Sequence, residues 1–191
     1  MMREEKKPFF TVKSMVLIGV FAAVIAVLAQ IAIPTPWGIA FTLQTFAVSL
    51  TGYCLGKWKG TLAVFVYMLL GFVGVPVFAG FGAGPATLFG PTGGYIWGFL
   101  FLSLACGLED KCKKKWLAVF LGIAGLLICY LCGTLQFAWI TNRTFAEAFL
   151  LAVVPYIVKD VVSIAAAYGL AIPLRKVMDS VGGSGKKAVA E

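Results

Sequence analysis

Lys159 and Asp160 are the residues of this 191-residue chain best placed for chemistry, because they lie inside the apolar run VVPYIVKDVVSIAAAYGL. An ionisable side chain within a membrane helix is energetically costly and by default indicates a functional site. A buried carboxylate can accept charge-assisted hydrogen bonds from N–H donors, and an ammonium group can pair with an anion. The alternative is a local pair at the outer membrane interface, with Lys159 extending toward the headgroups.

A helix through this run gives the two charged residues polar neighbours. At about 100° per residue, Tyr156, Asp160, Ser163 and Ala167 share one face, and Lys159 lies on its flank one turn before Ser163. We therefore expect Tyr156, Lys159, Asp160 and Ser163 to line a ligand site that combines an acid, hydroxyl groups and a cation.

A second polar group lies in the segment FTLQTF, residues 41–46. Gln44 can contact a ligand or hydrogen-bond a neighbouring helix, and both interpretations stay open. Thr42 and Thr45 are expected to hydrogen-bond neighbouring helices.

The residue types present exclude several kinds of active site. The chain has no histidine, the usual general base at neutral pH and the commonest nitrogen ligand of metals. Cys129 and Cys132 form a C-x-x-C inside an apolar run without a second pair, which is typical of buried thiols. The segment GYCLGK, residues 52–57, lacks the spacing of a phosphate-binding loop. We expect no catalytic residue, no metal, no cofactor and no ATP-hydrolysing site.

The composition predicts an integral membrane protein. The chain is 61% hydrophobic and 13% charged, with a mean hydropathy of +0.96, whereas soluble domains are about 25% charged. Its length suits about six helices of about 20 residues each, with no soluble domain left over. The formal net charge of +8 is spread between the apolar runs, which indicates membrane topology and not nucleic-acid binding.

We predict one all-α membrane domain over residues 1–191. It has a cytoplasmic tail at 1–13, a bundle of six transmembrane helices at 14–174 and a second cytoplasmic tail, expected to be disordered, at 175–191. The expected spans are Ser14 to Ile33, Gly38 to Gly56, Gly60 to Gly71, Gly93 to just before Glu109, Trp116 to Ile140, and Ala148 to Leu174.

A glycine-rich stretch separates the third and fourth spans. It reads GFVGVPVFAGFGAGPATLFGPTGGYIWG, residues 71–98, and it is apolar but too rich in glycine and proline for one helix. Non-helical backbone at membrane depth is tolerated where protein covers it or where it lines a cavity. We therefore predict a partly re-entrant outer loop over a pocket. Aromatic residues here and nearby either wall a ligand or form interface belts: Trp37, Phe78, Phe81, Phe89, Tyr95 and Trp97.

Basic residues predict the orientation in the cytoplasmic membrane. They gather in both tails, beside Lys57 and Lys59, and in the cluster EDKCKKK at residues 109–115, whereas the opposite connections contain only Arg143. By the positive-inside rule both termini are cytoplasmic and the glycine-rich stretch faces outward. The expected site then lies in the outer half of the membrane.

Small residues recur four apart in the first helix, as Gly19 with Ala23 and as Ala22 with Ala26. This spacing permits close helix packing, either within the bundle or against a partner subunit.

Four motifs together resemble the BioY family, the biotin-capturing S components of energy-coupling-factor transporters. They are TLQTFAV from Thr42, GVPVFAGFGAG from Gly74, LFGPTGGYIWGF from Leu88 and PYIVKD from Pro155. The likeness extends from about Met15 to Leu174. One position departs from the family's common D-x-x-K, because Ser163 stands three residues after Asp160, and Lys159 is the candidate replacement.

The resemblance implies a six-helix bundle that binds biotin from outside without covalent chemistry. It also implies partners: a transmembrane coupling protein and two cytoplasmic ATPases, with Ala22 and Ala26 matching the docking surface. The loop from Gly71 to Gly94 would act as a lid. The expected substrate-binding residues are Asp160, Lys159, Ser163, Tyr156, Gln44, Phe78, Gly80 and Tyr95.

Three alternatives stay open. The chain could serve another small vitamin, it could be a membrane-embedded enzyme that uses Asp160, or it could be a purely structural bundle. A lone intramembrane acid without histidine argues against the enzyme, because acid–base catalysis usually needs a second positioned group.

Overall fold

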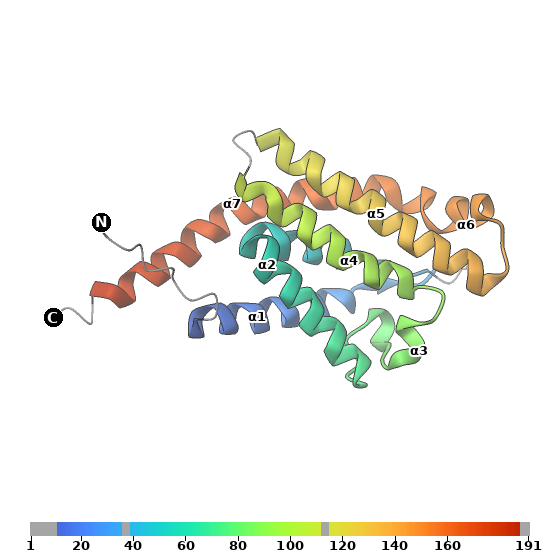
Figure 1. The fold of residues 1–191 in the computed structure, drawn as a ribbon, viewed down its shortest axis with the longest axis horizontal. Coiled ribbons are helices and arrows are strands. Elements are labelled where there is room, and N and C mark those ends of the chain that lie inside the picture. Colours follow the sequence, from blue (N-terminus) through green and yellow to red (C-terminus); the bar gives the residue numbers. More distant parts are fainter. Residues whose placement is uncertain (1–10, 36–38, 112–114, 188–191) are drawn as a thin grey trace, which may run out of the picture.

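The structure is a computed structural model that describes residues 11–35, 39–111 and 115–187, and it forms an elongated bundle of helices (Figure 1). The helices of eight or more residues are α1 (Val12–Ala29), α2 (Gln44–Phe72), α4 (Gly93–Cys106), α5 (Lys115–Thr141), α6 (Phe145–Ala152) and α7 (Ile157–Lys187). Shorter elements are β1 (Ala32–Ile33), β2 (Phe41–Thr42), α3 (Pro85–Leu88) and the 3₁₀ turns η1 (Ala79–Phe81), η2 (Gly107–Lys111) and η3 (Val154–Tyr156).

Helix α2 is two helical arms joined at Gly56, whose φ of 75° and ψ of 173° are not helical. Gln44 Nε2 lies 2.9 Å from the hydroxyl oxygen of Tyr67, although the two residues would be about 35 Å apart along a straight helix at 1.5 Å per residue. A Cβ at Gly60 would lie 2.9 Å from the Cα of Gly52. The chain therefore turns back at Gly56, close to where the sequence predicts a break.

Helix α1 ends earlier than the apolar run from Ser14 to Ile33 predicts. Helix α1 stops at Ala29, and the next residues pair as β1 with β2 in an antiparallel ribbon that sets Ala32 opposite Thr42. The proline at position 34 has no backbone N–H and disfavours the helical conformation in the residue before it. This ribbon carries the chain over one end of the bundle to the start of α2.

The last helix runs further than expected. We predicted a disordered tail from residue 175, but α7 continues through Pro173 to Lys187. Two contacts support its polar part: Arg175 forms an ion pair of 3.0 Å with Glu109, and Lys13 Nζ donates to the carbonyl of Met178 at 2.6 Å. The start of α1 and the C-terminal part of α7 therefore lie at the same end of the molecule (Figure 1).

The bundle is held together by close helix packing around one main core. A Cβ at Gly98 in α4 would lie 2.6 Å from the Cα of Cys129 in α5, and one at Gly52 in α2 would lie 2.5 Å from the carbonyl oxygen of Ser103 in α4. Glycine at these positions lets the helix backbones approach, as is common in membrane bundles. Tyr53, Tyr67 and Leu102 are among the buried side chains of this core.

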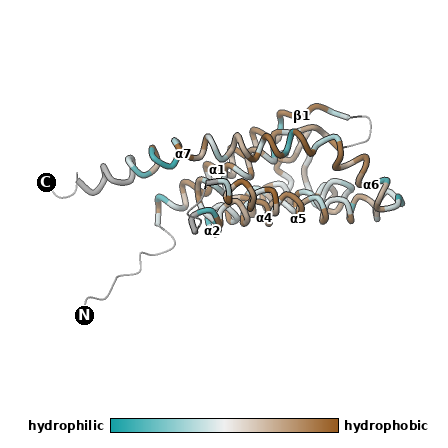
Figure 2. The backbone as a smooth tube through the Cα atoms, turned by 90° about the horizontal axis from the view of Figure 1, so that it is seen from above, coloured by the Kyte–Doolittle hydropathy of each residue, from teal (hydrophilic) through white to brown (hydrophobic). Residues whose placement is uncertain are grey.

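Three helical segments of the described residues are long and apolar enough to cross a membrane: Val12–Ala29, Trp116–Thr141 and Phe145–Ser180. Gly93–Glu109 is apolar but shorter. Figure 2 shows hydrophobic residues over most of the bundle and hydrophilic ones in the C-terminal part of α7.

The residues between α2 and α4, here called the 73–92 connection, contain only the short elements η1 and α3. Phe78 is its buried anchor, because its ring packs edge-on against Tyr67 with the ring centroids 5.5 Å apart. The amide of Gly84 donates to the carbonyl of Gly71 at 2.7 Å, so the connection folds back onto the end of α2.

Candidate functional site

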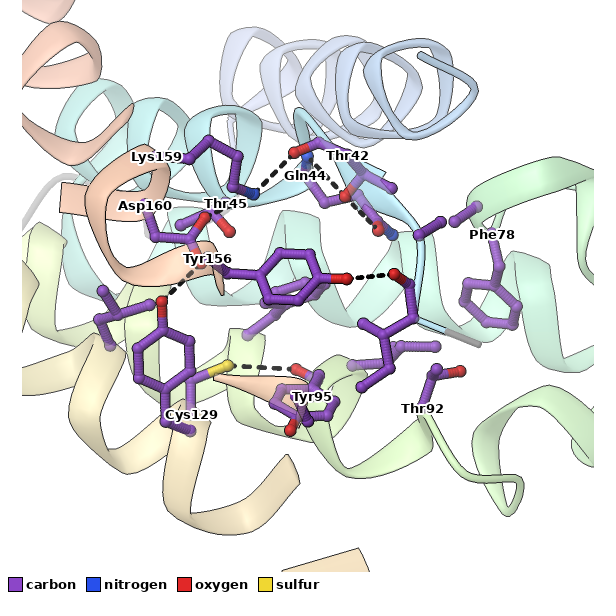
Figure 3. Close-up of a pocket in the computed structure, with 18 of the residues that line it drawn as sticks. Thr42, Gln44, Thr45, Phe78, Thr92, Tyr95, Cys129, Tyr156, Lys159 and Asp160 are labelled. Atoms are coloured by element: carbon purple, nitrogen blue, oxygen red, sulfur yellow. Dashed lines mark hydrogen bonds and ion pairs between the residues drawn. The ribbon is translucent and has the colours of Figure 1, made fainter. Parts of the chain in front are cut away.

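A cavity of about 180 Å³ lies where α2, α4, α5 and α7 meet the β2 strand and the 73–92 connection (Figure 3). One water needs about 10–15 Å³ by this kind of measure, so the cavity has room for a small organic molecule. Its lining residues are Ile39, Ala40, Thr42, Gln44, Thr45, Phe78, Ala79, Thr87, Thr92, Tyr95, Ile96, Phe99, Leu126, Cys129, Tyr130, Ala152, Tyr156, Lys159 and Asp160.

Asp160 is the buried acid of this cavity, with 3% of its surface exposed. The hydroxyl of Tyr130 donates to its Oδ2 at 2.7 Å. Its Oδ1 forms an ion pair of 2.6 Å with Lys159 Nζ but accepts no hydrogen bond from the described residues. A buried carboxylate oxygen in this state has capacity for a ligand N–H donor, because an ionised carboxylate accepts several hydrogen bonds.

Lys159 joins α7 to the ribbon that covers one end of the bundle. Its Nζ donates to the carbonyl of Thr42 at 2.9 Å and lies 4.9 Å from the ring centroid of Phe41. The ring centroid of Tyr156, in the adjoining turn η3, is 5.8 Å away. The ammonium group thus faces a carboxylate, a carbonyl and two aromatic rings, which together offset the cost of burying its charge.

Gln44 is oriented by hydrogen bonds at both ends of its amide. Nε2 donates to the hydroxyl of Tyr67 at 2.9 Å. Oε1 accepts from Thr42 Oγ1 at 2.9 Å (Figure 3). An amide nitrogen has a second hydrogen. Gln44 therefore hydrogen-bonds within the protein and also lines the cavity, and its contact with a ligand stays a prediction.

Tyr156 contributes its ring to the cavity, while its hydroxyl donates to the carbonyl of Ile39. The ring lies beside that of Phe41, with centroids 5.7 Å apart. Tyr156, in η3, and Lys159, in the first turn of α7, therefore both contact residues 39–42. These two contacts fasten one wall of the cavity.

The remaining walls are mainly apolar. Phe78 comes from the 73–92 connection, Ile96 and Phe99 from α4, and Leu126 from α5. Cys129 also faces this space, and its Sγ donates to the carbonyl of Tyr95 at 3.4 Å. Ligand pockets commonly combine apolar walls with a few placed polar groups, and this cavity has that character.

The structure brings together most of the residues that the sequence singled out: Asp160, Lys159, Tyr156, Gln44, Phe78 and Tyr95. It does not place Ser163 or Gly80 in the cavity wall. Ser163 is buried one turn further along α7, and Gly80 lies in η1 beside the lining residue Ala79. Helical periodicity correctly predicted that Ser163 shares a face of α7 with Asp160, but the cavity does not extend as far along the helix as Ser163.

Tyr130 is the functional candidate that sequence reasoning missed. It lies in the apolar run of α5, 30 residues before Asp160, and no motif marks it. The available signal was a hydroxyl-bearing residue within an otherwise apolar helix, and many tyrosines in membrane proteins share that feature. Thr42 was expected to serve only as a contact between helices, but it also lines the cavity.

Three of the other aromatic candidates do not line the cavity. Phe81, Phe89 and Trp97 are exposed, which fits the alternative of an apolar outer surface. Trp37 lies outside the described residues.

The two small-residue pairs of α1 occupy different faces. Ala22 is 1% exposed and belongs to the main core, with Ala26 partly buried against it. In this structure the bundle itself covers the side chain of Ala22, and the expectation that Ala22 and Ala26 form a docking surface stays a prediction. Gly19 and Ala23 are exposed, and a Cβ at Gly19 would meet no atom within 4 Å.

Comparison with known sequences decides the family. A sequence model of the BioY family matches residues 2–180, nearly the whole chain. The chain belongs to the BioY family. The expected resemblance is thus confirmed.

Relatives named as BioY are similar to this chain over most of their length. The biotin transporter BioY of Thermotoga maritima is 40% identical over 166 residues, which cover 86% of this chain and 96% of the relative. The probable biotin transporter BioY of Pyrococcus horikoshii is 40% identical over 158 residues, 81% of this chain and 91% of the relative. These names describe those proteins.

The same fold is seen in a solved structure. The crystal structure of the S-component for biotin from an ECF-type ABC transporter superposes with a TM-score of 0.79 at 22% identity, covering 92% of this chain and 95% of that one. At this identity the match establishes the fold.

Proposed function

We propose that this BioY protein captures biotin at the outer face of the cytoplasmic membrane and serves as the substrate-specific component of an energy-coupling-factor transporter. Support comes from two relatives named as biotin transporters, each 40% identical to it over most of both chains. The chain acts as a transport component and not as an enzyme.

The observation that carries this proposal is the state of Asp160 inside an apolar cavity. The hydroxyl of Tyr130 donates to one carboxylate oxygen, and Lys159 Nζ lies 2.6 Å from the other, which keeps lone-pair capacity for a further N–H donor. The ureido ring of biotin has two N–H donors, and a charge-assisted bond from such a donor is roughly twice as strong as a neutral one. The valeryl chain of biotin is apolar and matches walls built from residues such as Phe99 and Leu126.

We assign substrate contact to the residues that face this cavity: Asp160, Lys159, Tyr156, Gln44, Phe78 and Tyr95. Lys159 stands where it can replace the lysine absent at Ser163, since its Nζ already lies 2.6 Å from Asp160 Oδ1. The 73–92 connection covers the ligand as a lid and is partly re-entrant.

The proposed membrane arrangement has about six spans, with the two arms of α2 counted separately and α6 continuing into α7. An even number places both termini on one side. The contact between Lys13 and Met178 supports this, because it joins the start of α1 to the end of α7. The positive-inside rule makes that side cytoplasmic.

The proposed partners are a transmembrane coupling protein and two cytoplasmic ATPases, which supply the energy that this chain cannot generate itself. Docking through α1 would use its exposed small residues, with Ala26 at the edge of that face and Ala22 beneath it. A capture function for another vitamin would keep this whole arrangement and change only the ligand.

Binding of radiolabelled biotin to the purified chain in detergent tests the assignment. We expect tight binding without any partner subunit and at least a hundredfold weaker binding for Asp160→Asn, which keeps the size of the side chain but removes its charge. Asp179→Asn is the matched control, because Asp179 is exposed on the same helix. Absence of binding to the wild-type chain would overturn biotin as the ligand, and unchanged binding by Asp160→Asn would overturn the site.

A further inference from the structure

Gln30 links α1 to the 73–92 connection, although it does not line the cavity. It caps the C-terminal end of α1, where its side-chain Nε2 donates back to the carbonyl of Ala26 at 3.1 Å. The same nitrogen reaches the carbonyl of Phe78 at 3.2 Å and that of Pro76 at 3.5 Å. On its other side Oε1 accepts from the amide of Phe81 at 2.9 Å.

These contacts hold a tight loop whose conformation needs support. The amide of Phe78 donates to the carbonyl of Gly82 at 3.0 Å, which closes the loop. Within it Phe81 has a φ of 60°, a conformation that is strained for a bulky residue. Its side chain is exposed, so burial does not offset this strain. The hydrogen bond from its amide to Gln30 helps to hold the strained residue in place.

Phe78 is the part of this loop that meets the ligand site. Its ring is 1% exposed, lines the cavity and packs edge-on against Tyr67. Tyr67 in turn accepts the hydrogen bond from Gln44. A shift of Phe78 would therefore open one wall of the cavity and disturb the orientation of a polar residue within it.

A second glutamine holds the other half of the connection. Gln136 in α5 donates from Nε2 to the carbonyls of Leu88 at 3.1 Å and Gly90 at 2.8 Å. Among the described residues, Gln136 makes no hydrogen bond to residues 76–82. The two glutamines make the same kind of amide-to-backbone contact at the two ends of one segment, which provides a matched comparison.

We propose that Gln30 is a positioning residue for ligand retention: its amide seats residues 76–82 against the end of α1 and so keeps Phe78 in the cavity wall. This inference rests on the proposed function, in which the cavity holds biotin. Gln30 does not touch the ligand. It acts through the backbone of Phe78 and Phe81, and its loss lets bound biotin escape.

The test is the dissociation rate of radiolabelled biotin from the purified full-length chain after a chase with unlabelled biotin. We expect Gln30→Leu to raise the dissociation rate about tenfold and to change the association rate by less than about threefold. Gln30→Glu keeps an acceptor for the amide of Phe81 but loses the donor to Phe78, so its rate should be intermediate. Gln136→Leu should stay within about threefold of the wild type.

This readout separates positioning from a general folding defect. A misfolded fraction lowers the number of binding sites per molecule, but the dissociation rate is measured only on molecules that hold ligand. A wild-type dissociation rate in Gln30→Leu, or an equal increase in Gln136→Leu, would overturn the inference.

Hydrogen exchange of the same variants gives a measurement that does not depend on ligand identity. Residues 76–82 should exchange about tenfold faster in Gln30→Leu than in the wild type, with residues 88–90 unchanged, and Gln136→Leu should show the reverse pattern. Unaltered exchange at 76–82 would also overturn the inference. Failure of the wild-type chain to bind biotin, with faster exchange at 76–82 in Gln30→Leu, would overturn the proposed function and leave the seating role supported.

Discussion

At the residue scale, the candidate site centres on Asp160, a buried acid whose two carboxylate oxygens have different neighbours. Tyr130 donates to one oxygen of Asp160 at 2.7 Å, and Lys159 lies 2.6 Å from the other. The two neighbours differ in kind, because the tyrosine makes a directed hydrogen bond and the lysine supplies charge. They should therefore respond differently to substitution.

Tyr130→Phe removes the hydroxyl and leaves Asp160 Oδ2 buried without its donor. A hydrogen bond to a charged group contributes about 1.5–3 kcal/mol, and 1.4 kcal/mol corresponds to a tenfold change in affinity. We expect biotin to bind about tenfold or more weakly, as measured by calorimetric titration. Tyr168→Phe is the control, because Tyr168 packs against Tyr53 away from the cavity. An unchanged Kd in Tyr130→Phe would mean that Asp160 needs no support from α5.

Lys159→Met removes both the ion pair with Asp160 and the hydrogen bond to Thr42. Because the charge of Asp160 then lacks its buried partner, we expect at least tenfold weaker biotin binding, with partial recovery in Lys159→Arg. Lys176→Met changes an exposed lysine on the same helix and should leave equilibrium binding as it is. Equal affinities for wild type and Lys159→Met would show that this lysine does not replace the one absent at Ser163.

At the element scale, the position of the 73–92 connection depends on a glycine at the end of α2. A Cβ at Gly71 would lie 2.1 Å from the Cζ of Phe78, so that any side chain there competes with the ring for the same space. The carbonyl of Gly71 also accepts from Gly84 at 2.7 Å. The second arm of α2 and the 73–92 connection therefore form one unit.

Gly71→Ala should displace Phe78 and lower both thermal stability and biotin affinity. Overpacking of this kind typically costs about 1–3 kcal/mol, which we expect to appear as a lower Tm in a detergent thermal-shift assay. Gly169→Ala is the control on α7, where a Cβ would meet no atom within 4 Å. If Gly71→Ala and Gly169→Ala both had the Tm of the wild type, Phe78 would be packed less tightly against Gly71 than the structure indicates.

At the scale of the whole molecule, both ends of the described chain lie at one end of the bundle, and the cavity lies where residues 39–42 and 73–92 meet the helices. In the proposed arrangement, capture takes place on one side of the membrane and coupling on the other. Termini on the same side fit an even number of spans, because an odd number would put them on opposite sides.

Reporter fusions test this arrangement. A green fluorescent protein joined to the C-terminus should fluoresce, and alkaline phosphatase at the same place should be inactive, because both results indicate a cytoplasmic end. Phosphatase inserted between Arg143 and Thr144 should instead be active. Active phosphatase at the C-terminus would contradict the proposed topology and the number of spans.

The sequence by itself predicted the class of protein, the break in α2 near Gly56 and the family, and it singled out Lys159 and Asp160, which the structure places in the cavity wall. These follow from local properties: apolar runs, glycine punctuation, and the cost of placing a charge in an apolar helix. Only the tertiary structure decided that Tyr130 donates to Asp160, that Ser163 lies beyond the cavity, that Ala22 is in the core and that Gln30 hydrogen-bonds to the 73–92 connection. Helical periodicity defines which residues share a face, but the rotation of each helix against its neighbours decides what that face meets. The deciding contacts join residues far apart in the chain, such as Tyr130 with Asp160 and Gln30 with Phe78.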